Sequence, residues 1–161
     1  SFTSMDHWKV GTIAATGVAV AISLYLWKSG RLSQDEEEDE QSTDVSFGEK
    51  AKTVEEMVSR LKRLKMVTSP RVAATLLKID RKYFVDEADI SQAYFEQALP
   101  IGFNATISAP HMHGLGLDLI VDRISPGAKV LDIGSGSGFM SACFAELVGP
   151  TGKVFGVEHI Q

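Results

Sequence analysis

The stretch from residue 129 to 158 constrains the fold more than any other part of this 161-residue sequence. An apolar run at 129–131 predicts a strand, and it leads into Asp-Ile-Gly-Ser-Gly-Ser-Gly at 132–138. The breaker-free run at 139–148 predicts a helix, and 153–157 predicts a second strand. We expect both strands to be buried and parallel. Strand, glycine turn, helix and strand make half of a doubly wound nucleotide-binding sheet, so the sequence predicts an α/β, Rossmann-like fold.

The spacing of the glycines indicates the class of ligand. A dinucleotide fingerprint reads Gly-x-Gly-x-x-Gly, whereas the third of Gly134, Gly136 and Gly138 comes one residue early. Asp132 precedes them, and a carboxylate there suits a cationic or amine-bearing ligand better than a pyrophosphate. S-adenosylmethionine, with a sulfonium, an ammonium and no phosphate, fits, and Glu158 would accept hydrogen bonds from its ribose. A tight turn with no ligand, in which Asp132 satisfies backbone donors, remains the alternative.

The composition limits which binding partners and which cellular compartment we expect for this chain. Hydrophobic residues are 44% of the chain, enough for the core of roughly one domain. The net charge is −5 and no basic stripe with interleaved aromatics is present, so we expect no nucleic-acid partner. Cys143 is the one cysteine, which excludes an internal disulfide and favours a reducing compartment. A small core residue is the favoured role for Cys143, with a reactive thiol as the alternative.

The N-terminal part predicts a membrane anchor and a linker. Residues 10–27 contain no charge, and as a helix they would span about 27 Å, close to the thickness of a bilayer core. We therefore expect residues 1–31 to form a transmembrane helix, with the weak basic bias after it placing the rest of the chain in the cytosol. A cleaved signal peptide and a buried soluble helix stay open. The acidic stretch 32–48 predicts a disordered linker. We expect residues 49–161 to form the folded domain.

Two amphipathic helices are expected at the start of this domain. Thr53 and Glu56 form a capping box before the first, and Ser69 with Pro70 predicts the N-cap of the second. The apolar positions of the two helices are Val54, Met57, Val58, Leu61 and Leu64, then Val72, Ala73, Leu76 and Leu77. We interpret the basic residues of the first helix as a solvated face, with an anionic partner as the alternative; they are Arg60, Lys62, Arg63 and Lys65.

A segment dense in small polar and turn-forming residues lies between these helices and the glycine turn, and by itself predicts a loop leading into a helix at 115–124. It reads Ile-Gly-Phe-Asn-Ala-Thr-Ile-Ser-Ala-Pro-His-Met-His at 101–113. Together with Leu-Asp-Ile-Gly-Ser-Gly-Ser-Gly at 131–138, it resembles the protein-L-isoaspartate (D-aspartate) O-methyltransferase family. Shorter matches occur at 79–81, 142–145 and 151–154, so that the resemblance covers roughly 53–161.

The resemblance implies an activity and a fold. Members of the family transfer a methyl group from S-adenosylmethionine to the free α-carboxylate of L-isoaspartyl and D-aspartyl residues. The methyl ester closes to a succinimide that partly reopens to normal aspartate, which repairs the damaged protein. We therefore expect a Rossmann-like methyltransferase fold with N-terminal helices, and isoaspartyl proteins and peptides as partners.

The resemblance also implies site residues. Ser108 matches the active-site serine of the family and is also expected to contact the cofactor, and Glu158 matches the acid that binds the ribose. The segment that closes over the cofactor is Ile101, Gly102, Phe103 and Asn104, and the methionine-side cradle is Asp132, Gly134, Ser135, Gly136 and Gly138. Two residues depart from the pattern: Asn104 stands where relatives often have glutamine, and Glu158 stands where close relatives have aspartate.

Elementary chemistry agrees with these roles. The acceptor carboxylate is already ionised at neutral pH, so methyl transfer requires no general base and depends on positioning. Ser108 is therefore expected to orient the carboxylate as a hydrogen-bond donor. His111 and His113 do not share a helix face and have no third ligand nearby, so we predict hydrogen bonds behind the site for them and no metal.

The sequence ends three residues after Glu158, and a doubly wound sheet requires more strands than two. We expect a C-terminally truncated domain that is monomeric, marginally stable and by itself nearly inactive. The alternatives are another Rossmann methyltransferase, an NAD-dependent oxidoreductase, and a non-catalytic membrane-tethered isoform.

Overall fold

The computed structural model describes residues 50–159. The predicted membrane helix at 1–31 and the predicted linker at 32–48 lie outside the described residues. In the described part, none of the helices combines the length and the apolar character that a membrane crossing requires.

The described part begins with helical elements, and short strands follow. Helices α2 (Val54–Arg63) and α3 (Pro70–Lys78) are followed by the 3-10 turns η1 (Arg81–Phe84) and η2 (Glu87–Gln92). Next come β1 (Leu99–Pro100), β2 (Thr106–Ile107), α4 (Pro110–Ile120) and η3 (Val121–Arg123). The chain ends with β3 (Lys129–Ile133), α5 (Phe139–Val148) and β4 (Lys153–Val157).

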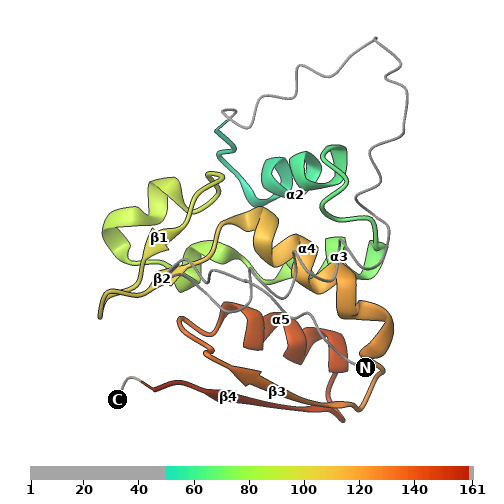
Figure 1. Cartoon of the computed structure of the whole chain (residues 1–161). Coiled ribbons are helices and arrows are strands. Elements are labelled where there is room, and N and C mark those ends of the chain that lie inside the picture. Colours follow the sequence, from blue (N-terminus) through green and yellow to red (C-terminus); the bar gives the residue numbers. More distant parts are fainter. Residues whose placement is uncertain (1–49, 160–161) are drawn as a thin grey trace, which may run out of the picture. The chain divides into compact units, whose positions relative to one another are not determined.

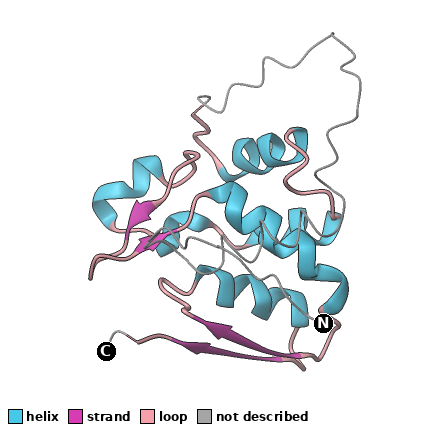
Figure 2. Cartoon of the chain, in the orientation of Figure 1, coloured by secondary structure: helices cyan, strands magenta, loops and turns pink. Residues whose placement is uncertain are grey.

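These elements stack in layers, as Figures 1 and 2 show. The β3–β4 sheet forms one outer layer, and α5 packs on it. Helix α3 contacts both α5 and α2, and α4 packs between α2 and α3. The β1–β2 hairpin stands at one end of this stack (Figure 1). The hydrophobic core therefore lies among the helices and on one side of the sheet.

Both N-terminal helices begin where the sequence predicts. Thr53 Oγ1 accepts a hydrogen bond from Glu56 N at 3.2 Å. The Glu56 carboxylate accepts a hydrogen bond from Lys52 N at 2.7 Å, whereas in a usual capping box the donor would be the N–H of Thr53 itself. Ser69 is the N-cap of α3, but its side chain makes no capping bond. The carboxylate of Asp118 in α4 instead accepts the N–H of Ser69 at 2.8 Å. The helix ends are thus satisfied partly by residues distant in the sequence.

The prediction of a solvated basic face on α2 is wrong for Arg60. The Arg60 side chain is fully buried, whereas Lys62, Arg63 and Lys65 are exposed as expected. Arg60 follows Met57 by three residues, which places it at the edge of the apolar stripe. A second departure is Leu77, expected in the apolar stripe of α3, which is 44% exposed.

Helix α4 starts at Pro110, five residues before the predicted start, so the loop assigned to 110–113 is helical. Proline at the first helical position has its backbone angle preset for a helix and lacks the N–H that would be unsatisfied there. His111 and His113 therefore lie in the first turn of α4, and not in a loop.

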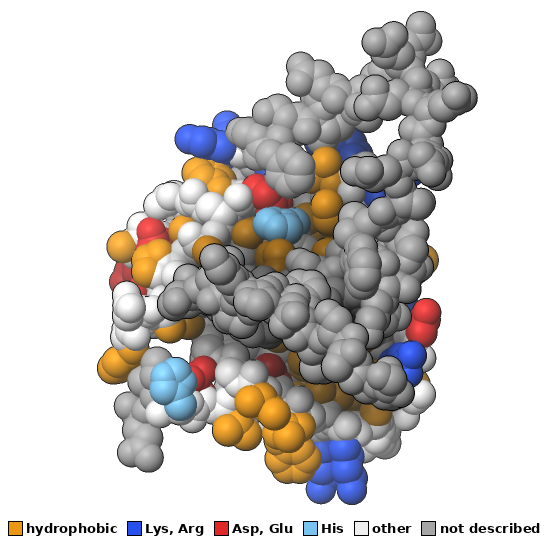
Figure 3. All heavy atoms as spheres, viewed as in Figure 1, with side chains coloured by type: hydrophobic (Ala, Val, Ile, Leu, Met, Phe, Trp, Pro, Cys, Tyr) orange, Lys and Arg blue, Asp and Glu red, His pale blue; other side chains and the backbone are white. Residues whose placement is uncertain are grey.

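Strands β3 and β4 pair in parallel, with Asp132 opposite Gly156 and Ile133 opposite Val157. The prediction that both strands are buried is wrong for one face of the sheet. Helix α5 covers the other face, while four large apolar side chains on the uncovered face are 51–75% exposed: Leu131, Ile133, Phe155 and Val157. Figure 3 shows hydrophobic side chains gathered at the end of the molecule where the sheet lies.

Candidate functional site

The glycine turn, residues 134–138, connects β3 to α5 and is tied to the end of β4. All three of its glycines have left-handed backbone angles, with φ of 83°, 52° and 85°, which non-glycine residues rarely adopt. The N–H groups of Gly134 and Ser135 donate to Val157 O at 2.8 and 3.1 Å. The N–H of Gly136 donates to Glu158 Oε2 at 2.9 Å. The turn is therefore held by hydrogen bonds to the neighbouring strand.

This use of the backbone donors limits what the turn can bind. Gly138 N donates to Ser135 O at 2.8 Å, so four of the five N–H groups of the turn, those of Gly134, Ser135, Gly136 and Gly138, already bond within the protein. A pyrophosphate-binding turn must direct such groups at its ligand. The geometry thus disfavours a dinucleotide, as the glycine spacing predicts.

Asp132, the acid before the glycines, lies at the carboxyl end of β3 and is half-buried. Its Oδ2 accepts a hydrogen bond from Ser141 Oγ at 2.6 Å, which fixes the carboxylate beside the first turns of α5. Gly156 of β4 leaves room for this arrangement, because a Cβ there would lie 3.1 Å from the side chains of Ser135 and Ser141. The sequence gives no signal for Ser141 as the partner of Asp132.

The predicted closing segment, 101–104, forms the tip of the β1–β2 hairpin. Strand pairing aligns Leu99 with Ile107, and the tip has three successive left-handed residues at 102–104. Phe103 and Asn104 have φ of 50° and 59°, an unfavourable conformation for residues with a side chain and one that is concentrated at functional sites. Phe103 is 78% exposed.

The hairpin and the glycine turn meet at Ile101 and Gly136, which are 35 positions apart in the sequence. A Cβ placed on Gly136 would lie 3.4 Å from Ile101 Cδ1, so the Ile101 side chain reaches the backbone of the turn. Ser108 follows β2 directly and precedes Ala109, the N-cap of α4; its side chain is half-buried. The structure therefore brings Ile101 and the turn together, and it places Ser108 at the base of the same hairpin.

A buried ion pair closes the base of this hairpin. Arg60 Nη2 lies 3.0 Å from Glu96 Oε2, with the two side chains 2% and 3% exposed, and it also donates to Tyr94 O at 3.1 Å. The other oxygen of Glu96, Oε1, accepts one hydrogen bond from the backbone N–H of His111 and one from its ring Nδ1, each at 2.8 Å. Because Ala109 offers no capping side chain, Glu96 supplies the cap of α4 from across the hairpin. Sequence patterns do not reveal the role of Glu96.

A second buried arginine supports the same region. Arg81 Nε donates to Ala93 O at 2.8 Å, and Nη1 lies 3.2 Å from His113 Nδ1. The His113 ring packs on Phe139, the first residue of α5, with 4.7 Å between ring centroids. The arginine, the histidine and the aromatic ring thus connect the start of the hairpin to the helix that follows the glycine turn.

Burial and charge explain the protonation of these groups. The pKa of His113 is lowered to about 3, so its imidazole is neutral. Burial is the largest cause, and the nearby Arg81 and His111 add to it. Burial likewise lowers the pKa of Arg81 to about 10. The prediction that His111 and His113 make hydrogen bonds agrees with these contacts. No group of three potential metal ligands occurs among residues 50–159.

Glu158 stays ionised at the rim of the turn. The hydrogen bonds from Gly136 N and then from His159 N hold the pKa of its carboxyl below the ordinary value. By contrast, burial raises the pKa of the Cys143 thiol to about 12, which supports a core role for this residue.

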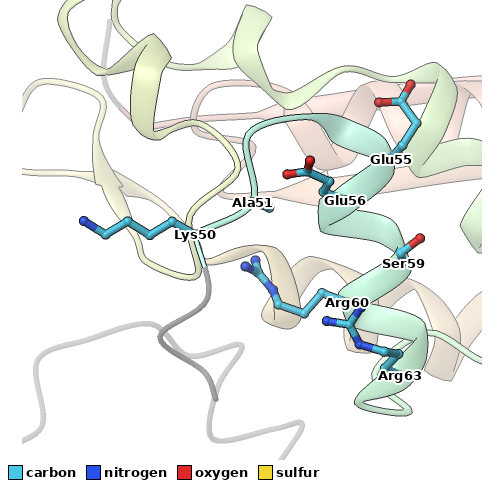
Figure 4. Close-up of a pocket in the computed structure, with 7 residues that line it drawn as sticks. All are labelled: Lys50, Ala51, Glu55, Glu56, Ser59, Arg60 and Arg63. Carbon is cyan, nitrogen blue, oxygen red and sulfur yellow. The ribbon is translucent and has the colours of Figure 1, made fainter. Parts of the chain in front are cut away.

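A separate hollow of about 230 Å³ lies along α2 (Figure 4). Figure 4 shows Arg60 and Arg63 on one side of it and Lys50 on the other. Its lining residues are Lys50, Ala51, Glu55, Glu56, Ser59, Arg60 and Arg63. None of the predicted site residues lines it, so we place the candidate site at the glycine turn.

Comparison with known proteins gives a consistent family. The family model for "Protein-L-isoaspartate(D-aspartate) O-methyltransferase (PCMT)" matches residues 52–161. Protein-L-isoaspartate O-methyltransferase 2 of Arabidopsis thaliana is 49% identical over 104 residues, which cover 65% of this chain and 33% of that protein. The Triticum aestivum protein-L-isoaspartate O-methyltransferase is 48% identical over 104 residues, covering 65% and 44%. The chain therefore spans between a third and a half of the length of these relatives.

Solved structures agree with the predicted fold class. A Plasmodium falciparum protein-L-isoaspartate O-methyltransferase in complex with S-adenosyl-L-homocysteine superposes with a TM-score of 0.62 at 30% identity. The match covers 68% of this chain and 50% of that one. A second protein-L-isoaspartate O-methyltransferase superposes with a TM-score of 0.57 at 25% identity, covering 68% and 35%. The mixed α/β, Rossmann-like methyltransferase fold is thereby confirmed over the matched part.

Proposed function

Because the chain belongs to the protein-L-isoaspartate (D-aspartate) O-methyltransferase family, we propose that it forms part of a repair enzyme. The enzyme methylates the free α-carboxylate of L-isoaspartyl and D-aspartyl residues in damaged proteins, using S-adenosylmethionine. The observation that carries the proposal is the glycine turn, which has internally bonded N–H groups and carboxylates at both ends.

The residues at the turn fit this cofactor. Asp132 and Glu158 flank the turn with two carboxylates, which suits an ammonium group on one side and ribose hydroxyls on the other. Gly134, Gly136 and Gly138 bring the backbone close to a ligand, with Ser135 between them. The same arrangement disfavours the NAD-dependent alternative, because a pyrophosphate would meet few available backbone donors at the turn.

The reaction is a displacement at the methyl carbon. When bound, S-adenosylmethionine supplies a methyl group on a positively charged sulfur. A carboxylate oxygen of the acceptor forms a bond to this carbon while the carbon–sulfur bond breaks, and the electron pair stays on sulfur. The products are a neutral methyl ester and S-adenosylhomocysteine, and no proton has to move.

The chain's own residues supply positioning. Ser108 Oγ donates a hydrogen bond that orients the acceptor carboxylate. The hairpin tip, with Ile101, Gly102, Phe103 and Asn104, covers the turn and excludes water. The Glu96–His111 contact and the Arg60–Glu96 pair keep Ser108 and the tip in a fixed relation to α4. Precise orientation of the two reactants supplies most of the acceleration in a reaction of this type.

A methyl-transfer assay tests the function. The natural protein that contains this sequence should transfer radiolabelled methyl groups to an isoaspartyl peptide, and not to the same peptide with normal aspartate. Ser108→Ala should lower kcat/KM by roughly 10- to 100-fold, the effect of losing a hydrogen bond to a charged group. Ser59→Ala, an exposed serine on α2, is the control. Equal labelling of both peptides, or none, would refute the function.

We also propose, from the sequence alone, that residues 1–31 anchor the protein in a membrane. The acidic linker 32–48 then separates the anchor from a monomeric domain, 49–161, that faces the cytosol. Carbonate extraction of membranes tests the anchor, because release of the protein into the supernatant would exclude it.

A further inference from the structure

We propose that Glu158 is a positioning residue that sets the shape of the glycine turn through the Gly136 N–H before any ligand binds. This role is additional to the contact with the cofactor ribose. The inference rests on the proposed function for the identity of the ligand, but not for the contact itself.

The contact is placed where it can control the turn. Gly136 is the middle residue of the turn, and its N–H donates to Glu158 Oε2 at 2.9 Å. The residues before it, Gly134 and Ser135, are bonded to the carbonyl of Val157, next to Glu158 in β4. The Glu158 carboxylate therefore holds the middle residue of the turn, while backbone bonds hold Gly134, Ser135 and Gly138.

The middle of the turn is also where the closing segment arrives. The Ile101 side chain lies against Gly136, so a shift of Gly136 would change the contact between the hairpin tip and the turn. A carboxylate that fixes Gly136 thus fixes both sides of the cofactor site at once.

The carboxylate can serve both roles together. Two carboxylate oxygens offer about four acceptor positions. Glu158 Oε2 uses one for Gly136 N, and Oε1 accepts from His159 N at 2.7 Å and from His159 Nδ1 at 2.6 Å. Acceptor capacity remains on Oε2 for a ribose hydroxyl, and the His159 side chain is 88% exposed, so a ligand hydroxyl can replace it at Oε1. Ligand binding therefore does not require the Gly136 bond to break.

The length of the side chain is essential to this role. Aspartate at this position would be shorter by one C–C bond, about 1.5 Å, and could not reach Gly136 N from the same backbone. Glutamine would keep both the length and one acceptor oxygen, but not the charge. These two variants therefore separate the structural contact from the charge.

The test measures the Gly136 amide directly. In the ligand-free natural protein, solvent exchange of the Gly136 amide proton is followed by NMR in wild type, Glu158→Asp and Glu158→Gln. We expect exchange about tenfold faster in Glu158→Asp, as for the loss of one charge-assisted hydrogen bond, and near-wild-type exchange in Glu158→Gln. The Ala142 amide, bonded within α5 to Gly138 O, reports that the fold is intact. Glu146→Gln, in the exposed pair with Lys78, is the matched control for loss of a carboxylate.

Affinity for S-adenosylhomocysteine, measured by isothermal titration, links the contact to the site. Glu158→Asp should bind at least tenfold more weakly than wild type although it retains a carboxylate. Unchanged Gly136 exchange in Glu158→Asp would overturn the inference, as would wild-type affinity in that variant. If wild type fails to bind S-adenosylhomocysteine while Gly136 exchange responds as expected, the contact stands and the proposed function falls.

Discussion

Replacing Glu96 by glutamine should destabilise the protein strongly, because it removes one half of a buried ion pair. The Glu96 and Arg60 side chains are 3% and 2% exposed, so water cannot take over the role of the carboxylate. Glutamine is nearly isosteric and keeps one acceptor oxygen, which can still receive the His111 N–H. The substitution therefore changes charge with little change in packing.

The expected cost follows from removing the carboxylate that faces the buried Arg60 guanidinium. Removing one partner of a buried pair costs about 3–5 kcal/mol, mostly from the charge that is left behind. Since one hydrogen bond to His111 survives, we expect the lower end, about 3 kcal/mol. For a domain of this size, each kcal/mol lowers Tm by about 4 °C, so Tm should fall by roughly 12 °C.

Urea unfolding at pH 7, followed by circular dichroism, measures the effect. The double variant Arg60→Met with Glu96→Gln removes both charges and should be more stable than Glu96→Gln alone, since paired removal is often neutral. Lys78→Met with Glu146→Gln, which removes an exposed pair, should cost less than about 1 kcal/mol. A loss below 1 kcal/mol for Glu96→Gln, or a double variant no more stable than the single one, would refute the reasoning.

Three further predictions concern packing, pH and thiol chemistry. Gly152→Ala should cost about 1–3 kcal/mol in urea unfolding, because its Cβ would overlap the Val148 side chain; an unchanged midpoint would contradict this packing. His113 has its pKa lowered to about 3 by burial and by Arg81, while the unfolded chain takes up this proton near pH 6.5. The unfolded state therefore binds more protons between these values, and stability should rise with pH across that window. His113→Asn, which keeps an acceptor facing Arg81, should reduce the difference in urea midpoint between pH 4.5 and 7, and an unchanged difference would argue against this origin. The fully buried Cys143 thiol, with its pKa raised to about 12, should react with a thiol reagent at pH 8 only after unfolding; rapid reaction of the native protein would show that the core opens.

The sequence predicts the local parts of the structure well. The bounds of α5 and β4, the position of Glu158 at the end of β4 and the N-caps at Thr53 and Ser69 agree with the structure, because each depends on residues close in the chain. The contact between Ile101 of the closing segment and the glycine turn is long-range, and no local pattern predicts it.

The interactions that sequence patterns miss are long-range. Arg60 and Glu96 are 36 residues apart. Helical periodicity considers only nearby residues, so it assigns the arginine to the solvent-facing side of the helix and cannot identify a distant partner. The burial of β3 is wrong for a similar reason, since an apolar strand predicts a covering layer but not whether that layer is present. Ser141 was missed because a serine inside a helix gives no sign that it bonds to a carboxylate of the preceding strand.

The uncovered face of the β3–β4 sheet bears on how the chain is handled during synthesis. The three elements β3, α5 and β4 leave the ribosome one after another, so the parallel pair forms from a single short stretch. Leu131, Ile133, Phe155 and Val157 then present a flat apolar surface, which is the kind of surface that folding chaperones retain and that drives intermediates to aggregate.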